Sequence, residues 1–455
     1  MLRRIVPPDI SAPAQRKGRL GFAVSRRTFL LLLAGLVLMA PAFSDGRALW
    51  AMLAWDVAVL GAWALDLVRL PRPRELEVRC SWSGHLMLGE PVTLRVTVAS
   101  PARVDVDAIV DLPPELSPQP VSVGLQVPAR GESEAEVELT PRQRGDVEVG
   151  PVYLRYRSPL ALAERWAKAE LRQPVRLYPA AAARAERSLN LMRTRRIEVQ
   201  KRLARRKGIG REFESLRDYR HGDSFRDISW TATARRGKLI VKDYQVERGQ
   251  PVWIVLDCGR LMRGRIRGRS KLDYAASAAL NLAHVASYGG DRVGLLAYGH
   301  DQKRMVSPGR GDQHMRAIMD QLALAEEEPA ESAHLRAAGT LMAAQSRRAL
   351  VVWITDLADT AMVPEVIEGA SVLLDRHVLI FAVIDDPELR RAAASQPHHQ
   401  DDLFRSAAAV EVMHRRERQI ATLRGRGAHT LEVGGEGLSA RVIEQYLSLK
   451  ERDLL

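Results

Sequence analysis

The chain has 455 residues, of which 46% are hydrophobic and 27% charged, so it is long and apolar enough to bury the cores of two or three domains. The formal net charge of +13 favours an acidic partner such as nucleic acid, anionic lipid or an acidic protein surface. The only two cysteines, Cys80 and Cys258, lie in segments of different character. This excludes a disulfide framework and agrees with a reducing compartment.

The first 68 residues comprise a basic tail and two apolar runs. Residues 1–27 are rich in proline and arginine, and we expect them to form a disordered cytoplasmic tail. The stretch from Thr28 to Phe43 carries no charge, and a second apolar run extends from Ala48 to Val68. Because a membrane-spanning helix takes about 20 apolar residues, residues 28–68 are predicted to form a hairpin of two transmembrane helices.

Positive charge flanks both outer ends of this hairpin, whereas Arg47 in the turn is balanced by Asp45. The positive-inside rule then places both termini in the cytoplasm of a bacterium, with the hairpin in the inner membrane. A second interpretation is a twin-arginine export signal, which the run from Ser25 to Leu30 resembles. Asp56 lies within the second run, where a carboxylate is costly and a functional role is one interpretation. The alternative is that Asp56 sits near a thin or tilted part of the hairpin and is neutral or paired with a partner helix.

Beyond the hairpin, residues 75–179 alternate apolar and polar side chains between clusters of Pro, Gly and Ser. This pattern predicts an antiparallel β-sandwich-like domain. Residues 180–207 form a basic linker that is either a solvated helix or a binding site for the phosphates of lipid or nucleic acid. Its basic residues include Arg193, Arg195, Arg196, Lys201, Arg202, Arg205, Arg206 and Lys207.

Residues 251–450 alternate short apolar strands with amphipathic helices, which predicts a doubly wound, mostly parallel α/β sheet. The predicted strands are 252–257, 292–298, 350–356, 378–385 and 430–433, with a polar edge strand at 303–306. The predicted helices are 271–287, 313–325, 333–345, 364–375, 403–424 and 438–449. Ligands of such sheets collect at the carboxyl ends of strands, where Asp257, Asp356 and Asp385 stand.

Carboxylates at such an edge suit a hard cation such as Mg²⁺, so Asp257 and Asp356 are candidate metal ligands. The alternative is that both are polar groups of the sheet end with hydrogen-bonding roles. Asp386, which precedes Pro387, is instead expected to cap the next helix.

The strand that ends at Asp257, the Thr355-Asp356 strand end and the order of the helices resemble a von Willebrand factor type A domain. The resemblance implies a divalent-metal site made by an Asp-x-Ser-x-Ser loop, a threonine of a second loop and an aspartate of a third. Here Gly259 and Leu261 replace both serines, and Ser332 is the nearest candidate in the second loop. A metal site at Asp257 and Asp356 would therefore be degenerate, and no other cofactor is expected.

Residues 208–250 join aromatic side chains to charges of both signs. Ser224-x-x-Asp227 fits a capping box, and Gly237 is placed to end the helix that would follow, with Phe225, Ile228 and Trp230 as its apolar anchors. Because Arg and aromatic residues dominate interface hot spots, we predict a partner-binding surface here. Its residues are Arg217, Tyr219, Asp223, Arg226, Trp230 and Arg235. The alternative is a structural clasp between the β-rich segment and the sheet.

The same segment is similar to the bacterial family catalogued as domain of unknown function 58. The similarity rests on Gly210, Glu212, Phe213, Leu216, Arg217, Tyr219, Gly222, Asp223, Arg226, Ile228 and Trp230, followed by Ala234, Arg235, Leu239 and Glu247. The resemblance implies a membrane-tethered adaptor that works with AAA+ ATPases of the MoxR type and has no established catalytic activity.

The sequence contains no phosphate-binding glycine loop with its lysine, no Gly-x-Ser-x-Gly elbow and no paired-histidine zinc motif. No catalytic residues are predicted, and we expect a membrane-anchored adaptor or scaffold for protein complex assembly or maturation. Its expected partner is a MoxR-type AAA+ ATPase. Two alternatives stay open: a metal-dependent hydrolase of phosphate esters centred on Asp257 and Asp356, and binding of anionic lipid or nucleic acid by the basic linker.

Overall fold

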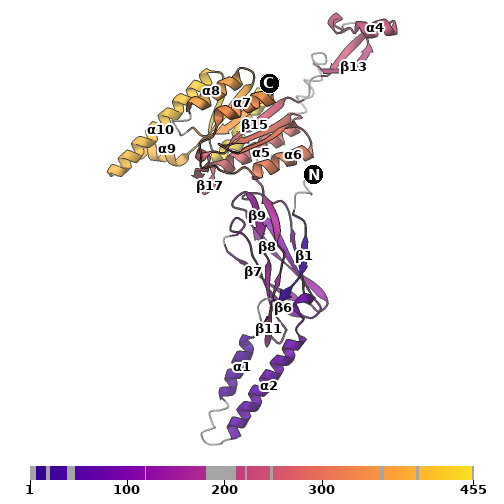
Figure 1. Ribbon diagram of the computed structural model, residues 1–455, viewed down its shortest axis with the longest axis vertical. Helices are drawn as coiled ribbons and strands as arrows, with labels where there is room; N and C mark the ends of the chain where they lie inside the picture. The colour runs from indigo at the N-terminus through magenta and orange to yellow at the C-terminus, as the bar shows by residue number, and fades with distance from the viewer. Residues whose placement is uncertain are drawn as a thin grey trace. The chain divides into compact units, whose positions relative to one another are not determined.

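The computed structural model describes residues 7–16, 21–37, 47–117, 119–180, 212–220, 223–245, 249–357, 363–395 and 399–452. The chain divides into two units, Met1–Tyr178 and Pro179–Leu455, and several of their elements are labelled in Figure 1. Apart from Ala180, the predicted basic linker lies outside the described residues, so its two interpretations stay open.

The first unit is built on two antiparallel sheets that share one apolar core. Its strands are β1 (Ile10–Pro13), β2 (Gln15–Arg16), β3 (Phe22–Val24), β4 (Glu77–Trp82), β5 (Val92–Ser100), β6 (Val104–Val110), β7 (Val121–Val127), β8 (Gly131–Leu139), β9 (Gly145–Val149), β10 (Val152–Arg157), β11 (Ala163–Ala169) and β12 (Gln173–Leu177). One sheet has the order β1-β4-β5-β8 and the other β2-β11-β10-β6-β7, with β3 also paired to β11 and β12 paired to β9. Side chains of both sheets meet in a single buried cluster, as the alternating pattern predicts for sheets with one buried face each.

The N-terminal tail is part of this unit. β1 pairs with β4 from Ile10, opposite Cys80, to Pro13, opposite Glu77. β2 and β3 both pair with β11, and Ala14 is fully buried between β1 and β2. The expectation of a disordered tail is therefore wrong for these described residues. The composition of the tail did not predict these strands, because β4 and β11 each have an open edge. An edge strand pairs with another segment through backbone hydrogen bonds alone.

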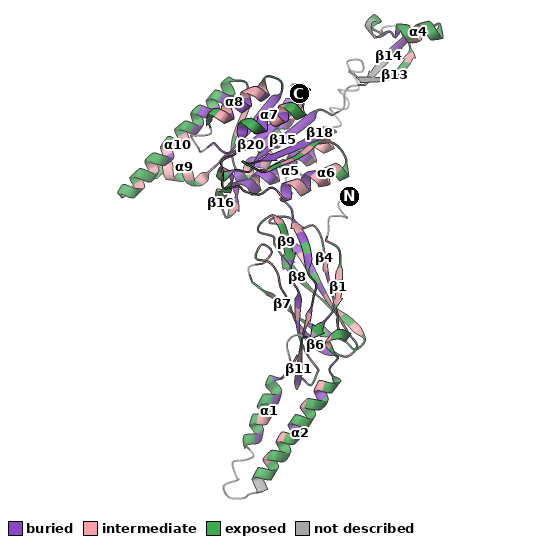
Figure 2. Cartoon of the chain, viewed as in Figure 1, coloured by how far each residue is buried: buried purple, intermediate pink, exposed green. Residues whose placement is uncertain are grey.

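Two apolar helices lie between the tail and β4: α1 (Arg26–Val37) and α2 (Arg47–Arg69). Within the described residues, one helix is long and apolar enough to cross a membrane, over Leu49–Arg69. α1 contributes 12 described residues, fewer than a span requires. The structure thus supports one candidate span and leaves the predicted two-helix hairpin unconfirmed. Both helices are mostly exposed along their length (Figure 2).

The second unit contains a doubly wound sheet. Its strands are β15 (Pro251–Asp257), β18 (Arg292–Tyr298), β19 (Lys303–Gly309), β20 (Leu350–Thr355), β21 (Val378–Asp385) and β22 (His429–Gly434). The spatial order is β19-β18-β15-β20-β21-β22, with β19 antiparallel at one edge and the other neighbours parallel. In chain order this is 3-2-1-4-5-6, the arrangement of doubly wound folds. The prediction of a mostly parallel doubly wound sheet is confirmed.

Helices cover both faces of this sheet (Figure 1). They are α5 (Lys271–Tyr288), α6 (Asp312–Ala323), α7 (His334–Ala344), α8 (Val363–Leu374), α9 (Pro387–Ala394), α10 (Gln400–Gly425) and α11 (Gly435–Glu451). α7, α8 and α10 pack around Trp353 and Phe381, while α5 and α11 pack on each other. Every residue of β15, β20 and β21 is buried, which explains why these strands are apolar without alternation. Asp386 caps α9, as predicted, by accepting from the Glu388 N–H at 2.9 Å.

Residues 212–220 and 223–245 form a separate structural element, here called the motif hairpin. β13 (Glu212–Asp218) pairs antiparallel with β14 (Ile240–Gln245), and a 3-10 turn, η3 (Phe225–Asp227), and α4 (Trp230–Arg236) lie between them in the chain. The predicted helix start at Ser224 is wrong because Ile228 pairs with Val241 and interrupts any helix there. α4 does end at Gly237, whose φ of 66° suits glycine.

Candidate functional site

The predicted partner-binding residues lie in the motif hairpin, where an arginine-carboxylate pair fixes the turn after β13. The two terminal nitrogens of the Arg217 guanidinium donate to the two oxygens of Asp223, at 2.7 and 2.8 Å. Asp223 also accepts from the backbone N–H of Arg220 at 2.8 Å. The hydrogen bonds from Arg217 and then from Arg220 lower the pKa of Asp223 to about 2. Arg217 and Asp223 therefore position the loop that carries the aromatic residues.

Aromatic side chains of the motif hairpin are exposed. The Phe225 and Trp230 side chains are 71% and 66% exposed, although the sequence favoured them as buried anchors of a helix. That expectation was wrong because the helix starts later. Among the described side chains of this element, the buried apolar ones are Ile228, Ile240 and Val241. The Tyr219 ring lies 6.0 Å from that of Phe225.

Basic side chains accompany these rings. Arg235 and Arg236 lie in the last turn of α4, both exposed, and Arg220 and Lys242 are exposed as well. The side chain of Arg226, a predicted site residue, lies outside what the structure describes. The described part of the predicted surface thus joins exposed aromatic rings to positive charge, a composition that suits a protein interface more than a folded core.

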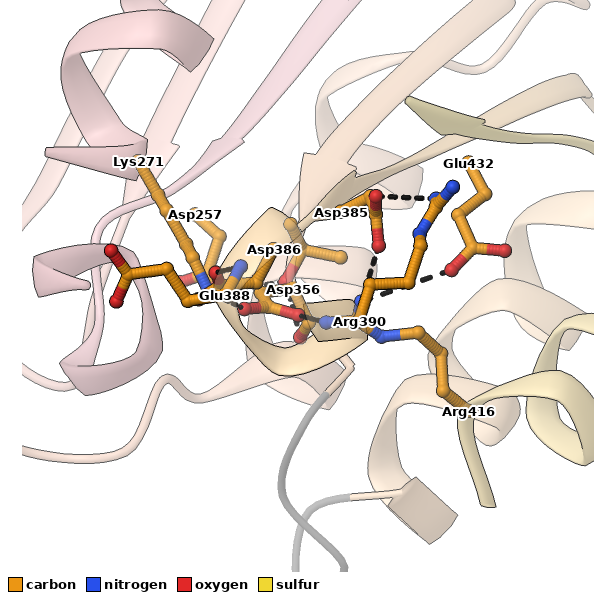
Figure 3. A network of polar contacts seen from close by, with 10 residues as sticks. Asp257, Lys271, Asp356, Asp385, Asp386, Glu388, Arg390, Arg416 and Glu432 are labelled. Atoms are coloured by element: carbon orange, nitrogen blue, oxygen red, sulfur yellow. Dashed lines mark hydrogen bonds and ion pairs between the residues drawn. The ribbon is translucent and has the colours of Figure 1, made fainter. Parts of the chain in front are cut away.

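A second polar cluster lies at the carboxyl edge of the sheet, where the neighbouring strands β15 and β20 end (Figure 3). One oxygen of Asp257 accepts from the Gly259 N–H at 2.9 Å and from the Ser332 hydroxyl. Its other oxygen accepts from the Thr355 hydroxyl at 2.5 Å. The sequence predicted Asp257 at this edge with Ser332 near it, and the structure brings the two together. Gly259 is required here, since a Cβ would lie 2.1 Å from the Ser332 hydroxyl oxygen.

Asp356, the next carboxylate along the edge, is held by two buried cations. Lys271 donates to one of its oxygens at 2.7 Å, and Arg416 donates to the other. All three side chains are at most 7% exposed. Because an uncompensated buried charge is costly, the contacts of Asp356 with both cations compensate the burial of all three groups.

The ion network extends from these cations to the end of β21 (Figure 3). Lys271 Nζ lies 3.2 Å from Asp386, and a guanidinium nitrogen of Arg416 lies 3.6 Å from Asp385. Burial alone would raise the pKa of Asp386, but the charge of Lys271 and backbone N–H groups hold it below its ordinary value. Arg390 completes the network through its own pair with Asp385.

Lys271 and Arg416 were missed by sequence reasoning. The position of Lys271 could have been noticed in the sequence. It is the first residue of α5, directly after the capping residue Ser270, where the helix dipole disfavours a cation. A lysine at that position indicates a nearby carboxylate. Nothing in the sequence distinguishes Arg416, because it lies in a basic run of α10 that resembles a solvated face.

The donor set at this edge fits internal ion pairing better than a metal ion. Within the described ranges, no group of three His, Cys, Asp or Glu side chains is arranged to hold a metal. Both oxygens of Asp356 face cationic donors, and both oxygens of Asp257 accept from hydroxyls. A divalent ion here would require Lys271 to leave, so no step of a mechanism is assigned to Mg²⁺.

Residues 215–419 match the family model described as "Protein of unknown function DUF58". This part of the chain is similar to the DUF58 family. The recognition of DUF58 from the sequence motif is confirmed, but its association with MoxR-type ATPases is not shown. The match covers the motif hairpin from Ser215 onward and the ion network.

Proteins similar to this chain include uncharacterized proteins from two bacteria. Rv1480 of Mycobacterium tuberculosis is 28% identical over 244 residues, which are 50% of this chain and 75% of the relative. YeaD of Bacillus subtilis is 25% identical over 178 residues, which are 39% of this chain and 42% of the relative. Among solved structures, the SpRpn10 VWA domain is similar with 12% identity and a TM-score of 0.26, covering 42% of this chain and 93% of that chain.

Proposed function

We propose that this protein is a membrane-anchored adaptor or scaffold that holds a protein partner through its motif hairpin. The observation that carries the proposal is the exposure of Phe225 and Trp230 beside arginines. Two strands and a seven-residue helix bury few side chains, so such an element gains from a partner that covers its aromatic residues. No catalytic role is assigned to any residue.

Strand pairing supports the membrane hairpin within this proposal. β1 and β3 precede α1, yet they pair with β4 and β11, which follow α2. If α2 crosses a membrane, the chain has to cross back between β3 and α2, and the apolar α1 lies in that interval. The proposal therefore places two spans in the bacterial inner membrane and both soluble units in the cytoplasm, where the flanking arginines favour them.

The proposed partner is an AAA+ ATPase of the MoxR type, as the family resemblance implies. The exposed cations Arg220, Arg235, Arg236 and Lys242 favour an acidic surface on that partner. The von Willebrand factor A-like sheet would serve as the rigid support of the adaptor, with its degenerate metal position closed by Lys271 and Arg416.

Affinity capture tests the proposal. The full chain would be cross-linked in membranes and purified, either unchanged or with Phe225→Ala and Trp230→Ala together. Because a single hot-spot truncation costs about 2 kcal/mol or more, which is about 30-fold in affinity, we expect the double variant to lose the ATPase by more than that factor.

Phe404→Ala is the matched control, since Phe404 on α10 is also 71% exposed and lies outside the motif hairpin. It should capture as much ATPase as the unchanged chain. Equal capture by the double variant, or repeated capture of no AAA+ ATPase by the unchanged chain, would contradict the proposal.

A further inference from the structure

Both apolar helices are fastened to one short segment of the β-rich unit, Ser158–Ala163, which connects β10 to β11. At the start of α1, the Thr28 hydroxyl donates to the Leu162 carbonyl at 2.7 Å, and Arg27 donates to the Leu160 carbonyl at 3.3 Å. The β-rich unit is therefore joined to α1 by direct hydrogen bonds, with no intervening linker.

The end of α2 is fastened to the same segment by a buried carboxylate. Asp66 accepts from the Ser158 hydroxyl at 2.5 Å and from the N–H groups of Leu162 and Ala163 at 3.1 and 3.0 Å. Arg165 adds a bond to the Leu67 carbonyl at 2.9 Å. If α1 and α2 enter a bilayer, Ser158–Ala163 is held at the depth where the helices emerge.

Apolar side chains are exposed at this same end of the unit. Leu160, at the tip of the segment, is 56% exposed, and Phe22 and Val24 of β3 are exposed beside it, opposite Arg165 and Ala163. The Phe22 ring also lies 6.0 Å from that of Trp63 on α2. Aromatic and aliphatic side chains that adjoin basic residues characteristically bury at the boundary between the headgroups and the acyl chains of a bilayer.

Arginines surround these apolar residues. They are Arg26 and Arg27 at the start of α1, Arg69 at the end of α2, Arg72 and Arg74 just after it, and Arg165 on β11. Within the described part of the chain, Arg26, Arg69, Arg72 and Arg74 form no ion pair, and Asp66 is the buried carboxylate that binds the segment. The exposed carboxylate of Glu75 lies among these arginines and offsets part of their charge. The exposed charge at this end is still positive on balance, and anionic headgroups attract such a cluster.

We propose that this end of the β-rich unit, the membrane collar formed by Phe22, Val24, Leu160 and the surrounding arginines, binds the headgroup layer of anionic phospholipids. The proposal rests on the membrane anchoring proposed above. It adds that lipid contacts extend beyond the helices to the β-rich unit and select negative headgroups. The collar then fixes the unit against the bilayer surface.

Headgroup quenching tests the collar. The full chain with Leu160→Cys would carry a fluorophore at that cysteine in vesicles of mixed phosphatidylcholine and phosphatidylglycerol. Cys80 and Cys258 are buried, so the unchanged chain labelled in parallel gives the background. We expect headgroup spin-labelled phosphatidylglycerol to quench the label more strongly than headgroup spin-labelled phosphatidylcholine. Gln119→Cys is the matched control, because Gln119 is exposed between β6 and β7 at the opposite end of β10.

Charge reversal at Arg26 and Arg69, both exposed, tests the preference for anionic lipid separately from the closeness of the label to the headgroups. Each arginine near an anionic surface contributes on the order of fivefold in affinity, so R26E with R69E should abolish the preference for phosphatidylglycerol and leave the label near the headgroups. Equal quenching by the two lipids in the chain with native arginines overturns the selectivity.

A label at Val57→Cys, on an exposed face of α2, distinguishes failure of the collar from failure of the anchor. Quenching at Val57 by acyl-chain spin labels, without quenching at Leu160, overturns the collar and keeps the anchor. Absence of quenching at both positions overturns both proposals.

Discussion

Lys271 has a buried positive charge at the carboxyl edge of the sheet, where it neutralises Asp356 together with Arg416. The Lys271→Met substitution keeps the apolar stem and removes the charge. Because removal of one partner leaves a buried charge undercompensated, we expect a loss of about 3–5 kcal/mol of stability in this unit. Hydrogen exchange followed by mass spectrometry of the full chain should then show reduced protection of β20 and α5.

Arg441→Met is the matched control for Lys271. Arg441 pairs with Glu444 on α11 at 3.2 Å, but both side chains are more than half exposed. Such pairs contribute about 0–1 kcal/mol, so exchange in β20 should not change. Equal loss of exchange protection in Lys271→Met and Arg441→Met would mean that the buried ion pair stabilises the fold no more than the exposed pair does.

Asp223 gives the fold a predicted dependence on pH. Its pKa in the folded chain is about 2, against an ordinary value of 3.8, because Arg217 and the Arg220 N–H favour the charged form. Because the pKa of Asp223 is lower in the folded chain than in the unfolded chain, its ionised form stabilises the fold, and this stabilisation is complete above about pH 4. The stabilisation is lost as the pH falls from about 4 through about 2.

A carboxyl NMR titration should place the Asp223 midpoint near 2. Arg217→Gln should move it toward 3.8, since Arg217 is the largest cause of the shift. Arg220→Gln keeps the backbone N–H that donates to Asp223, so it should move the midpoint much less. A midpoint near 3.8 in the unchanged chain would show that the Arg217 pair does not form in solution.

These residues also mark what sequence could predict about the site. Asp257 and Asp356 were placed at one edge because parallel strands bring their carboxyl ends together, whatever the loops do. Lys271 and Arg416 were not placed, since they reach Asp356 from helices 85 and 60 residues away in the chain. Helix rotation and the depth of a long side chain are set by packing, which the strand pattern does not encode.

At the scale of elements, Asp66 joins a helix to a sheet. Its carboxylate accepts hydrogen bonds from the Ser158 hydroxyl and from the backbone N–H groups of Leu162 and Ala163. Asp66→Leu would leave these donors without an acceptor, at about 1–3 kcal/mol each. We expect faster hydrogen exchange in β11 and easier proteolysis at Ser158–Ala163, and Asp66→Asn, which retains one carbonyl oxygen, should have an intermediate effect. Unchanged exchange in Asp66→Leu would contradict the anchoring role.

The elements also divide into those that local pattern determines and those that it does not. The apolar strands of the α/β sheet were found at nearly their observed bounds because they are buried on both faces. β1 and β3 were missed, since short edge strands are held by backbone bonds to β4 and β11 and need no apolar pattern. The helix predicted at Ser224 failed because a single long-range pairing, Ile228 with Val241, outweighed a local cap.

At the scale of the whole molecule, the pairing of β1 with β4 constrains topology more than hydropathy does. Segments on either side of the two helices share sheets, so they lie on one side of any membrane. An odd number of crossings between Val24 and Glu77 would pull these sheets apart. Export and cleavage after the twin-arginine-like sequence would likewise remove β1–β3 and open the edges of β4 and β11.

Cysteine accessibility in spheroplasts tests this topology on the full chain. Gln119→Cys, exposed in the β-rich unit, should react with an impermeant maleimide only after lysis, since the arginines at the helix ends favour the cytoplasm. Ser44→Cys, in the predicted turn of the hairpin, should react before lysis. Reaction of Gln119→Cys in intact spheroplasts would reverse the orientation. Protection of both cysteines until lysis would mean that the apolar helices do not carry the turn across the membrane, and would contradict the anchor on which the adaptor proposal depends.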